Sequence, residues 1–133
     1  MSATDTAIAK ATAAARAATA KLGREIKIID VSDQLAIADI FVVVSGDSER
    51  QVDAIFDSVA EALLAQGVKA LRREGKSAGR WVLLDYGDVV VHIMHAEERE
   101  FYGLERIWKD CPLIDVGLEE TVASTSATTE ATA

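Results

Sequence analysis

The sequence is poor in the features that would tie a protein to an oxidising compartment or to a membrane. It has one cysteine, Cys111, which excludes an internal disulfide and fits a reducing compartment. No apolar run approaches the roughly 20 residues that cross a bilayer. The first residues lack the charged start and the leucine-rich stretch of a secretory signal. We therefore expect a cytoplasmic protein that does not engage a membrane.

Positive charge is scarce and unevenly placed. The 133 residues carry 14 Lys and Arg against 22 Asp and Glu, a net charge of −8. Residues 1–25 hold four basic and two acidic side chains, a sum of +2, which leaves −10 for residues 26–133. An acidic body repels nucleic-acid phosphates, so we expect no direct, sequence-specific nucleic-acid binding. A basic protein is the better-matched partner, although surplus carboxylates also serve solubility alone.

Hydrophobic periodicity and capping signals predict three helical and five extended segments. The alanine-rich residues 3–22 predict a helix, and Ser48 followed by Gln51 marks the capped start of a second helix that ends at Gly67. Residues 96–116 carry helical signals that Gly103 and Pro112 interrupt. Strands are predicted at residues 25–31, 39–46, 68–75, 80–86 and 88–94.

This order of elements predicts an α/β fold, a small sandwich with a mixed β-sheet. The last two strands meet at Gly87 as an antiparallel hairpin, while the strand–helix–strand passage from 39 to 75 favours a right-handed parallel crossover. At 14.2 kDa the chain can bury one core, so residues 1–118 are expected to form a single domain. Residues 119–133 are small and polar and predict a disordered C-terminal tail.

Polar residues in and after the hairpin raise the question of catalysis. Asp85 and Asp88 flank the turn, and carboxylates bind divalent cations. Together with the Gly-Ser turn in "VSGDSER" (44–50) they are partly similar to a nucleotidyltransferase site, which needs two acids one residue apart on the following strand. This sequence has no such pair. His92 and His95 lack further zinc ligands, and Cys111 lacks a nucleophile signature, so we expect no metal, cofactor or catalysis.

The hairpin is also a candidate contact surface. Alternation along 80–86 separates two sets of side chains, Trp81, Leu83 and Asp85 on one face and Val82, Leu84 and Tyr86 on the other. If the second set faces the core, the first projects outward beside Asp88, Val90 and His92 of the partner strand. A patch of Trp, His, aliphatic and carboxylate side chains is typical of protein contacts. Alternation leaves a second interpretation open, in which both faces are covered and Trp81 is ordinary core.

Two segments carry a denser pattern. The first is Asp39, Phe41, Val42, Gly46, Ser48, Gln51 and Val52. The second is Glu74, Gly75, Gly79, Trp81, Asp85, Tyr86, Gly87, Asp88, Val91, His92, Arg99, Tyr102, Leu104, Glu105 and Trp108. Together they resemble the ribosomal silencing factor family, also called the Iojap family, over roughly residues 8–115. Ile40 and Asp47 stand where that family more often has Tyr and Asn.

The resemblance implies a nucleotidyltransferase-like fold without the catalytic acids, and a translational repressor that is not an enzyme. Members of the family bind the large ribosomal subunit through its ribosomal protein number fourteen, sterically block joining of the small subunit, and tend to be homodimers when free. Strand alternation, the acidic charge and this resemblance together predict the partner-binding residues Trp81, Leu83, Asp85, Tyr86, Asp88, His92 and Arg99. Two alternatives remain, a nucleotidyltransferase-type enzyme that binds magnesium and nucleotide, and a generic dimeric adaptor without ribosome association.

Overall fold

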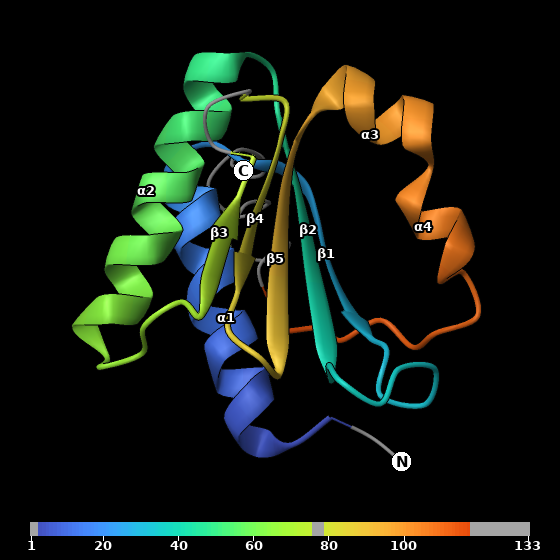
Figure 1. Cartoon of the computed structure of the whole chain (residues 1–133). Coiled ribbons are helices and arrows are strands. Elements are labelled where there is room, and N and C mark those ends of the chain that lie inside the picture. Colours follow the sequence, from blue (N-terminus) through green and yellow to red (C-terminus); the bar gives the residue numbers. More distant parts are fainter. Residues whose placement is uncertain (1–2, 76–78, 118–133) are drawn as a thin grey trace, which may run out of the picture.

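The computed structural model describes residues 3–75 and 79–117, which form four helices and five strands (Figure 1). In chain order the elements are α1 (Asp5–Ala20), β1 (Arg24–Asp30), β2 (Ile40–Gly46), α2 (Glu49–Ala65), β3 (Arg72–Glu74), β4 (Trp81–Asp85), β5 (Val89–His95), α3 (Ala96–Tyr102) and α4 (Leu104–Ile107). The predicted tail, residues 119–133, lies outside the described residues. No helix of the described part has the length and apolar character needed to span a membrane.

The sheet has the order β1-β2-β5-β4-β3, and the predicted mixed sheet is confirmed. β2 and β5 are parallel neighbours, whereas the other three neighbouring pairs are antiparallel, including the predicted β4–β5 hairpin. The passage from β2 through α2 to β3 joins strands of the same direction, as predicted, but β5 and β4 lie between them. The predicted strand 68–75 is reduced to the three exposed residues of β3.

Helices α1 and α2 cover one face of the sheet. The side chains of α1 that face inward are all alanines with no exposed surface, namely Ala7, Ala11, Ala14, Ala15 and Ala18, so the helix backbone packs close. α2 buries the apolar stripe Val52, Ile55, Phe56, Val59 and Leu63 against the same core. Its predicted cap is present, because Ser48 Oγ accepts the N–H of Gln51 at 3.1 Å.

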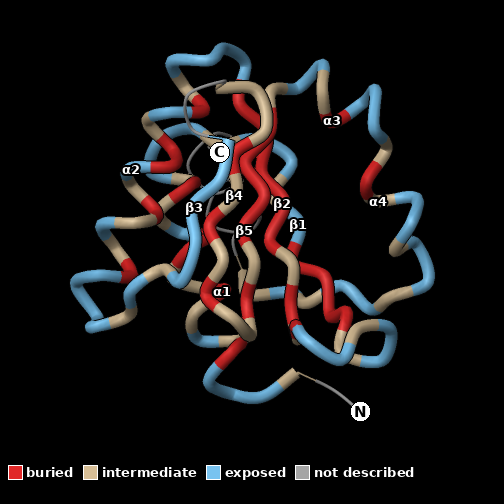
Figure 2. Tube along the Cα trace, viewed as in Figure 1, coloured by how far each residue is buried: buried red, intermediate tan, exposed pale blue. Residues whose placement is uncertain are grey.

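The other face of the sheet is covered only in part. α3 and α4 are short and end at Gly103, which adopts a left-handed conformation with φ of 58°, and at Trp108. They lie along one side of this face, over a second apolar cluster built on Ile29, Val31, Val43, Met94 and Leu104 (Figure 1). Half-buried residues therefore remain on β4 next to fully buried ones, as the alternating colours of that strand show (Figure 2).

Candidate functional site

The outer strand β4 places Trp81, Leu83 and Asp85 on the partly covered face. Each of the three is half-buried, while Val82 and Leu84 between them are buried against α1 and α2. The interpretation that the second set forms the core is therefore correct, and complete coverage of both faces is wrong. In the hairpin, Leu83 pairs with His92 and Asp85 pairs with Val90, so these side chains share the face.

Aromatic rings form a continuous row across this face. The ring of Tyr102 on α3 lies 5.0 Å from Trp81 on β4, and Trp81 lies 6.1 Å from His92 on β5. The row continues from His92 to Phe41 on β2 at 4.7 Å and from Phe41 to Trp108 at 5.4 Å. We call these five side chains the aromatic row. Its tilted and edge-to-face geometries are the ones that aromatic pairs prefer.

The aromatic row has an exposed end at α3. Phe101 packs edge-to-face on Tyr102 at 5.0 Å, and the two side chains are 79% and 52% exposed. Ile107 on α4 is also exposed. Large apolar side chains gathered beside a half-open sheet face are typical of a surface that binds another protein. We call the aromatic row together with Leu83, Asp85, Val90 and Phe101 the docking face.

His92 lies beneath this face and not on its surface, which corrects the prediction that it is exposed. It is 6% exposed, and its Nδ1 accepts the indole N–H of Trp81 at 3.2 Å. Burial lowers the pKa of His92 from 6.5 to about 4, so the ring is neutral and its proton sits on Nε2. Within the described residues that buried nitrogen has no hydrogen-bond partner. His92 thus orients Trp81.

The two hairpin acids do not form a common site. Asp85 Oδ1 accepts the N–H of Gly87 at 2.8 Å, and its other oxygen accepts a bond from Arg72 at 3.1 Å. Asp88 instead binds Lys10 of α1 at 3.0 Å, so its predicted place beside His92 is wrong. The reason is that β5 starts only at Val89, and strand alternation does not extend into the turn. Across residues 3–75 and 79–117, no three His, Cys, Asp or Glu side chains gather to hold a metal.

Two further predicted contact residues, Tyr86 and Arg99, are buried and not exposed on the surface. Tyr86 is 6% exposed and belongs to the core beneath α1 and α2, where burial raises its pKa. Arg99 is 4% exposed and donates to Glu105 and to the buried hydroxyl of Ser45. Neither side chain is placed to meet a partner. Of the seven predicted contact residues, the structure brings Trp81, Leu83 and Asp85 together on an accessible face.

Five residues of the docking face are absent from the predicted contact set. They are Phe41, Val90, Phe101, Tyr102 and Trp108. Phe41 lies in a strand whose sequence is apolar on both faces, so the sequence did not distinguish it from core residues. It is half-buried because α3 and α4 cover this face of the sheet only in part. Strand alternation placed Val90 beside the patch, but it was not counted as a contact residue. Phe101, Tyr102 and Trp108 lie within the interrupted helical segment 96–116, where no apolar stripe of helical period shows which side chains face outward.

The turn before α2 does not offer a free phosphate cradle. Ser48 Oγ caps the N–H of Gln51, and the N–H of Asp47 donates to Gln51 Oε1 at 2.6 Å. Arg80 lies at the same end of the sheet, where it pairs with Glu49, Glu97 and Glu98 at 2.8–3.4 Å. These internal contacts use the hydroxyl, the amide and the guanidinium that would bind a phosphate group.

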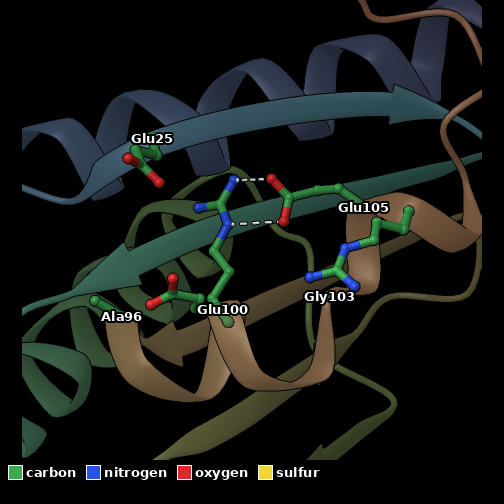
Figure 3. Close-up of a pocket in the computed structure, with 7 residues that line it drawn as sticks. Glu25, Ala96, Glu100, Gly103 and Glu105 are labelled. Atoms are coloured by element: carbon green, nitrogen blue, oxygen red, sulfur yellow. Dashed lines mark hydrogen bonds and ion pairs between the residues drawn. The ribbon is translucent and has the colours of Figure 1, made fainter.

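A polar hollow lies beside α3 and α4 (Figure 3). It is lined by Glu25, Ala96, Arg99, Glu100, Gly103, Glu105 and Arg106. The guanidinium of Arg99 is already bonded to Glu105, as the dashed lines in Figure 3 mark. The hollow therefore has the character of a structural ion-pair site, and none of the aromatic row lines it.

Comparisons with known proteins agree on one family. Residues 4–133 match the family described as "Ribosomal silencing factor during starvation". Ribosomal silencing factor RsfS of Bacillus subtilis is 39% identical over 103 residues, which are 77% of this chain and 87% of that protein. The mouse protein named mitochondrial assembly of ribosomal large subunit protein 1 is 34% identical over 64% of this chain and 39% of its own.

The fold agrees with the sequence match. A crystal structure of a Chromobacterium violaceum protein superimposes with a TM-score of 0.76 at 36% sequence identity, covering 77% of this chain and 86% of that one. The chain belongs to the ribosomal silencing factor family.

Proposed function

We propose that this protein represses translation by binding the large ribosomal subunit at the surface that meets the small subunit, so that the two subunits do not join. It binds through the docking face to a basic ribosomal protein, number fourteen of the large subunit. The observation that carries the proposal is the half-open aromatic row on a chain of this family. The name of the mouse relative, which refers to the large ribosomal subunit, supports the same choice of subunit.

Trp81 is the central anchor of this contact. It lies within the row, half-buried between Tyr102 and His92, and its indole N–H is already satisfied within the chain. A partner that covers it therefore gains apolar burial without leaving a polar atom unpaired. Truncation of such an anchor at an interface typically costs about 2 kcal/mol or more.

Charge favours a basic partner. The chain carries a net charge of −8, and Asp85 adds a carboxylate at the edge of the docking face. Complementary charge around an apolar centre speeds association and sets orientation. Steric exclusion by a bound 14.2 kDa body then suffices for repression, without any chemical step.

The free protein is a cytoplasmic homodimer in this proposal. Exposed apolar side chains such as Phe101 and Ile107 are commonly covered in the absence of the target. A second copy that covers the docking face would have to dissociate before the protein binds the large subunit.

Sedimentation of the added protein with separated ribosomal subunits through a sucrose gradient tests the proposal. The protein is expected with the large subunit and not with the small subunit or with joined ribosomes. A generic adaptor would remain at the top of the gradient, and saturable binding of a magnesium–nucleotide complex would instead support an enzyme.

A further inference from the structure

The segment that completes the docking face is held to the sheet by very few buried side chains. α3 has seven residues and α4 has four, and helices this short are not stable on their own. Within Ala96–Ile107 the buried residues are Arg99 and Leu104. Leu104 packs in the apolar cluster below, so Arg99 is the one buried polar residue of this segment. At its start, α3 is also held by ion pairs of Glu97 and Glu98 with Arg80, which lie nearer the surface.

Arg99 joins three elements through one guanidinium group. Its Nη1 donates to Ser45 Oγ on β2 at 2.8 Å, its Nε donates to Glu105 Oε1 at 3.1 Å, and its Nη2 donates to Glu105 Oε2 at 2.8 Å. Figure 3 shows the two parallel bonds between α3 and α4. Ser45 is 2% exposed, so the anchoring point lies inside the sheet.

This geometry fixes orientation better than apolar contacts do. A bidentate pair between a planar guanidinium and a carboxylate sets both distance and angle, while aliphatic contacts allow sliding. The hydrogen bonds from Arg99 lower the pKa of Glu105, so the carboxylate stays ionised and the pair stays intact near neutral pH. Gly103 between the helices makes the turn sharp, with φ of 58°.

The pair acts on the two ends of the aromatic row. Tyr102 follows Arg99 by three residues and touches Trp81, while Trp108 follows Glu105 by three residues and touches Phe41. Residues three apart on a helical turn are neighbours. A change in the Arg99–Glu105 geometry therefore moves both aromatic contacts at once.

We propose that Arg99 is a positioning residue of the docking face: it holds α3 and α4 in the one arrangement in which Tyr102 and Trp108 continue the row begun by Trp81 and Phe41. Arg99 touches no partner itself. This inference rests on the proposed function, because it assigns Arg99 a role in the same contact. The proposal explains how Arg99, which is buried and not exposed on the docking face, affects binding at that face.

The test compares four variants with the wild type, namely Arg99→Met, Glu105→Gln, Arg106→Met and Trp81→Ala. Arg106 is the matched control, because it is an exposed arginine next to Glu105 on α4. Two quantities are measured: affinity for purified large ribosomal subunits, and amide hydrogen exchange of residues 96–108 against that of β2 and β5. Amide exchange becomes faster at residues 96–108 if the substitution loosens this segment, and stays unchanged if the substitution only removes a direct contact with the partner.

Both Arg99→Met and Glu105→Gln are expected to weaken binding about tenfold or more, the scale of about 1.4 kcal/mol, while Arg106→Met binds as the wild type does. Exchange should become faster at 96–108 and stay unchanged in β2 and β5. Wild-type affinity in the two variants overturns the inference, and so does weak binding with unchanged exchange, which would make Arg99 a direct contact. If Arg99→Met fails to fold, Glu105→Gln decides by the same two criteria.

The Trp81→Ala variant separates this inference from the proposed function. If it loses binding while Arg99→Met and Glu105→Gln retain it, the docking face stands and only the role of Arg99 is wrong. If folded Trp81→Ala binds as tightly as the wild type, the docking face is wrong and the inference falls with it.

Discussion

The indole N–H of Trp81 donates to Nδ1 of His92 across 3.2 Å, and this bond ties the half-buried indole of the docking face to a buried imidazole on the neighbouring strand. Trp81 is opposite Met94 in the hairpin, so the bond runs diagonally between β4 and β5. The bond holds the indole in one orientation before any partner arrives. Preorganised aromatic side chains lose less entropy on binding than free ones.

The neutral state of His92 predicts a stability that depends on pH. The folded pKa is about 4 against 6.5 for an ordinary histidine, so between these values the unfolded chain binds a proton that the folded chain does not. Acid therefore favours unfolding, and the stabilisation is present above pH 6.5 and lost as pH falls towards 4. This one group is expected to make the protein about 2 kcal/mol less stable at about pH 5 than at about pH 7.

Urea denaturation of the wild type and of His92→Gln at both pH values measures this effect. Glutamine keeps an acceptor for the indole but does not titrate, so the variant should lose about 2 kcal/mol less on acidification. An equal loss in the two proteins would show that His92 is not held neutral by the fold.

A glycine at the end of β3 predicts a backbone constraint next to Trp81 on the neighbouring strand β4. Gly75 has φ of 82°, and a Cβ at this position would collide with the carbonyl oxygen of Trp81. Gly75→Ala should therefore cost more than about 3 kcal/mol, from the left-handed conformation and the steric overlap together. Gly67 has φ of 79° with open space around it, so Gly67→Ala should cost only about 1 kcal/mol. Thermal unfolding of both variants gives the comparison, and equal costs would contradict it.

The edge carboxylate predicts a rate effect that salt removes. Asp85→Asn should slow association with the large subunit several-fold at low ionic strength and leave dissociation nearly unchanged, because a charge at the rim of an interface acts mainly on encounter. At about 0.5 M salt the difference from the wild type should vanish, since charges are then screened within a few Å. Stopped-flow association with Glu61→Gln as the control, an exposed acid on α2, measures this. A salt-independent defect would instead implicate the local bonds from Asp85 to Gly87 and Arg72.

The sequence predicted the sheet and its orientation because those follow from short-range patterns. Alternation in β4 separated Val82 and Leu84 from Trp81 and Leu83, and the Ser48 cap with its apolar stripe defined α2. The pattern failed where a residue lies outside the repeating element. Asp88 is in a turn, and its side chain is directed by Lys10, which is 78 residues away in sequence.

The burial of individual polar residues could also not be predicted from the sequence. Arg99 and His92 are polar residue types of the kind expected on a surface, yet Ser45, Glu105 and Trp81 supply the bonds that allow their burial. These partners come from different elements and become neighbours only in the folded chain. Phe41 was missed for the converse reason, since an apolar strand gives no sign of which face is left partly uncovered.

Subunit joining measured by light scattering tests the central claim most directly. Trp81→Ala is compared with Leu64→Ala, which removes an equally apolar and 56% exposed side chain from α2 on the far side of the sheet, after circular dichroism shows that both are folded. We predict that the wild type and Leu64→Ala block joining at the same concentration, and that Trp81→Ala needs about 30-fold more, the equivalent of about 2 kcal/mol. A folded Trp81→Ala that blocks joining at the wild-type concentration would contradict the account.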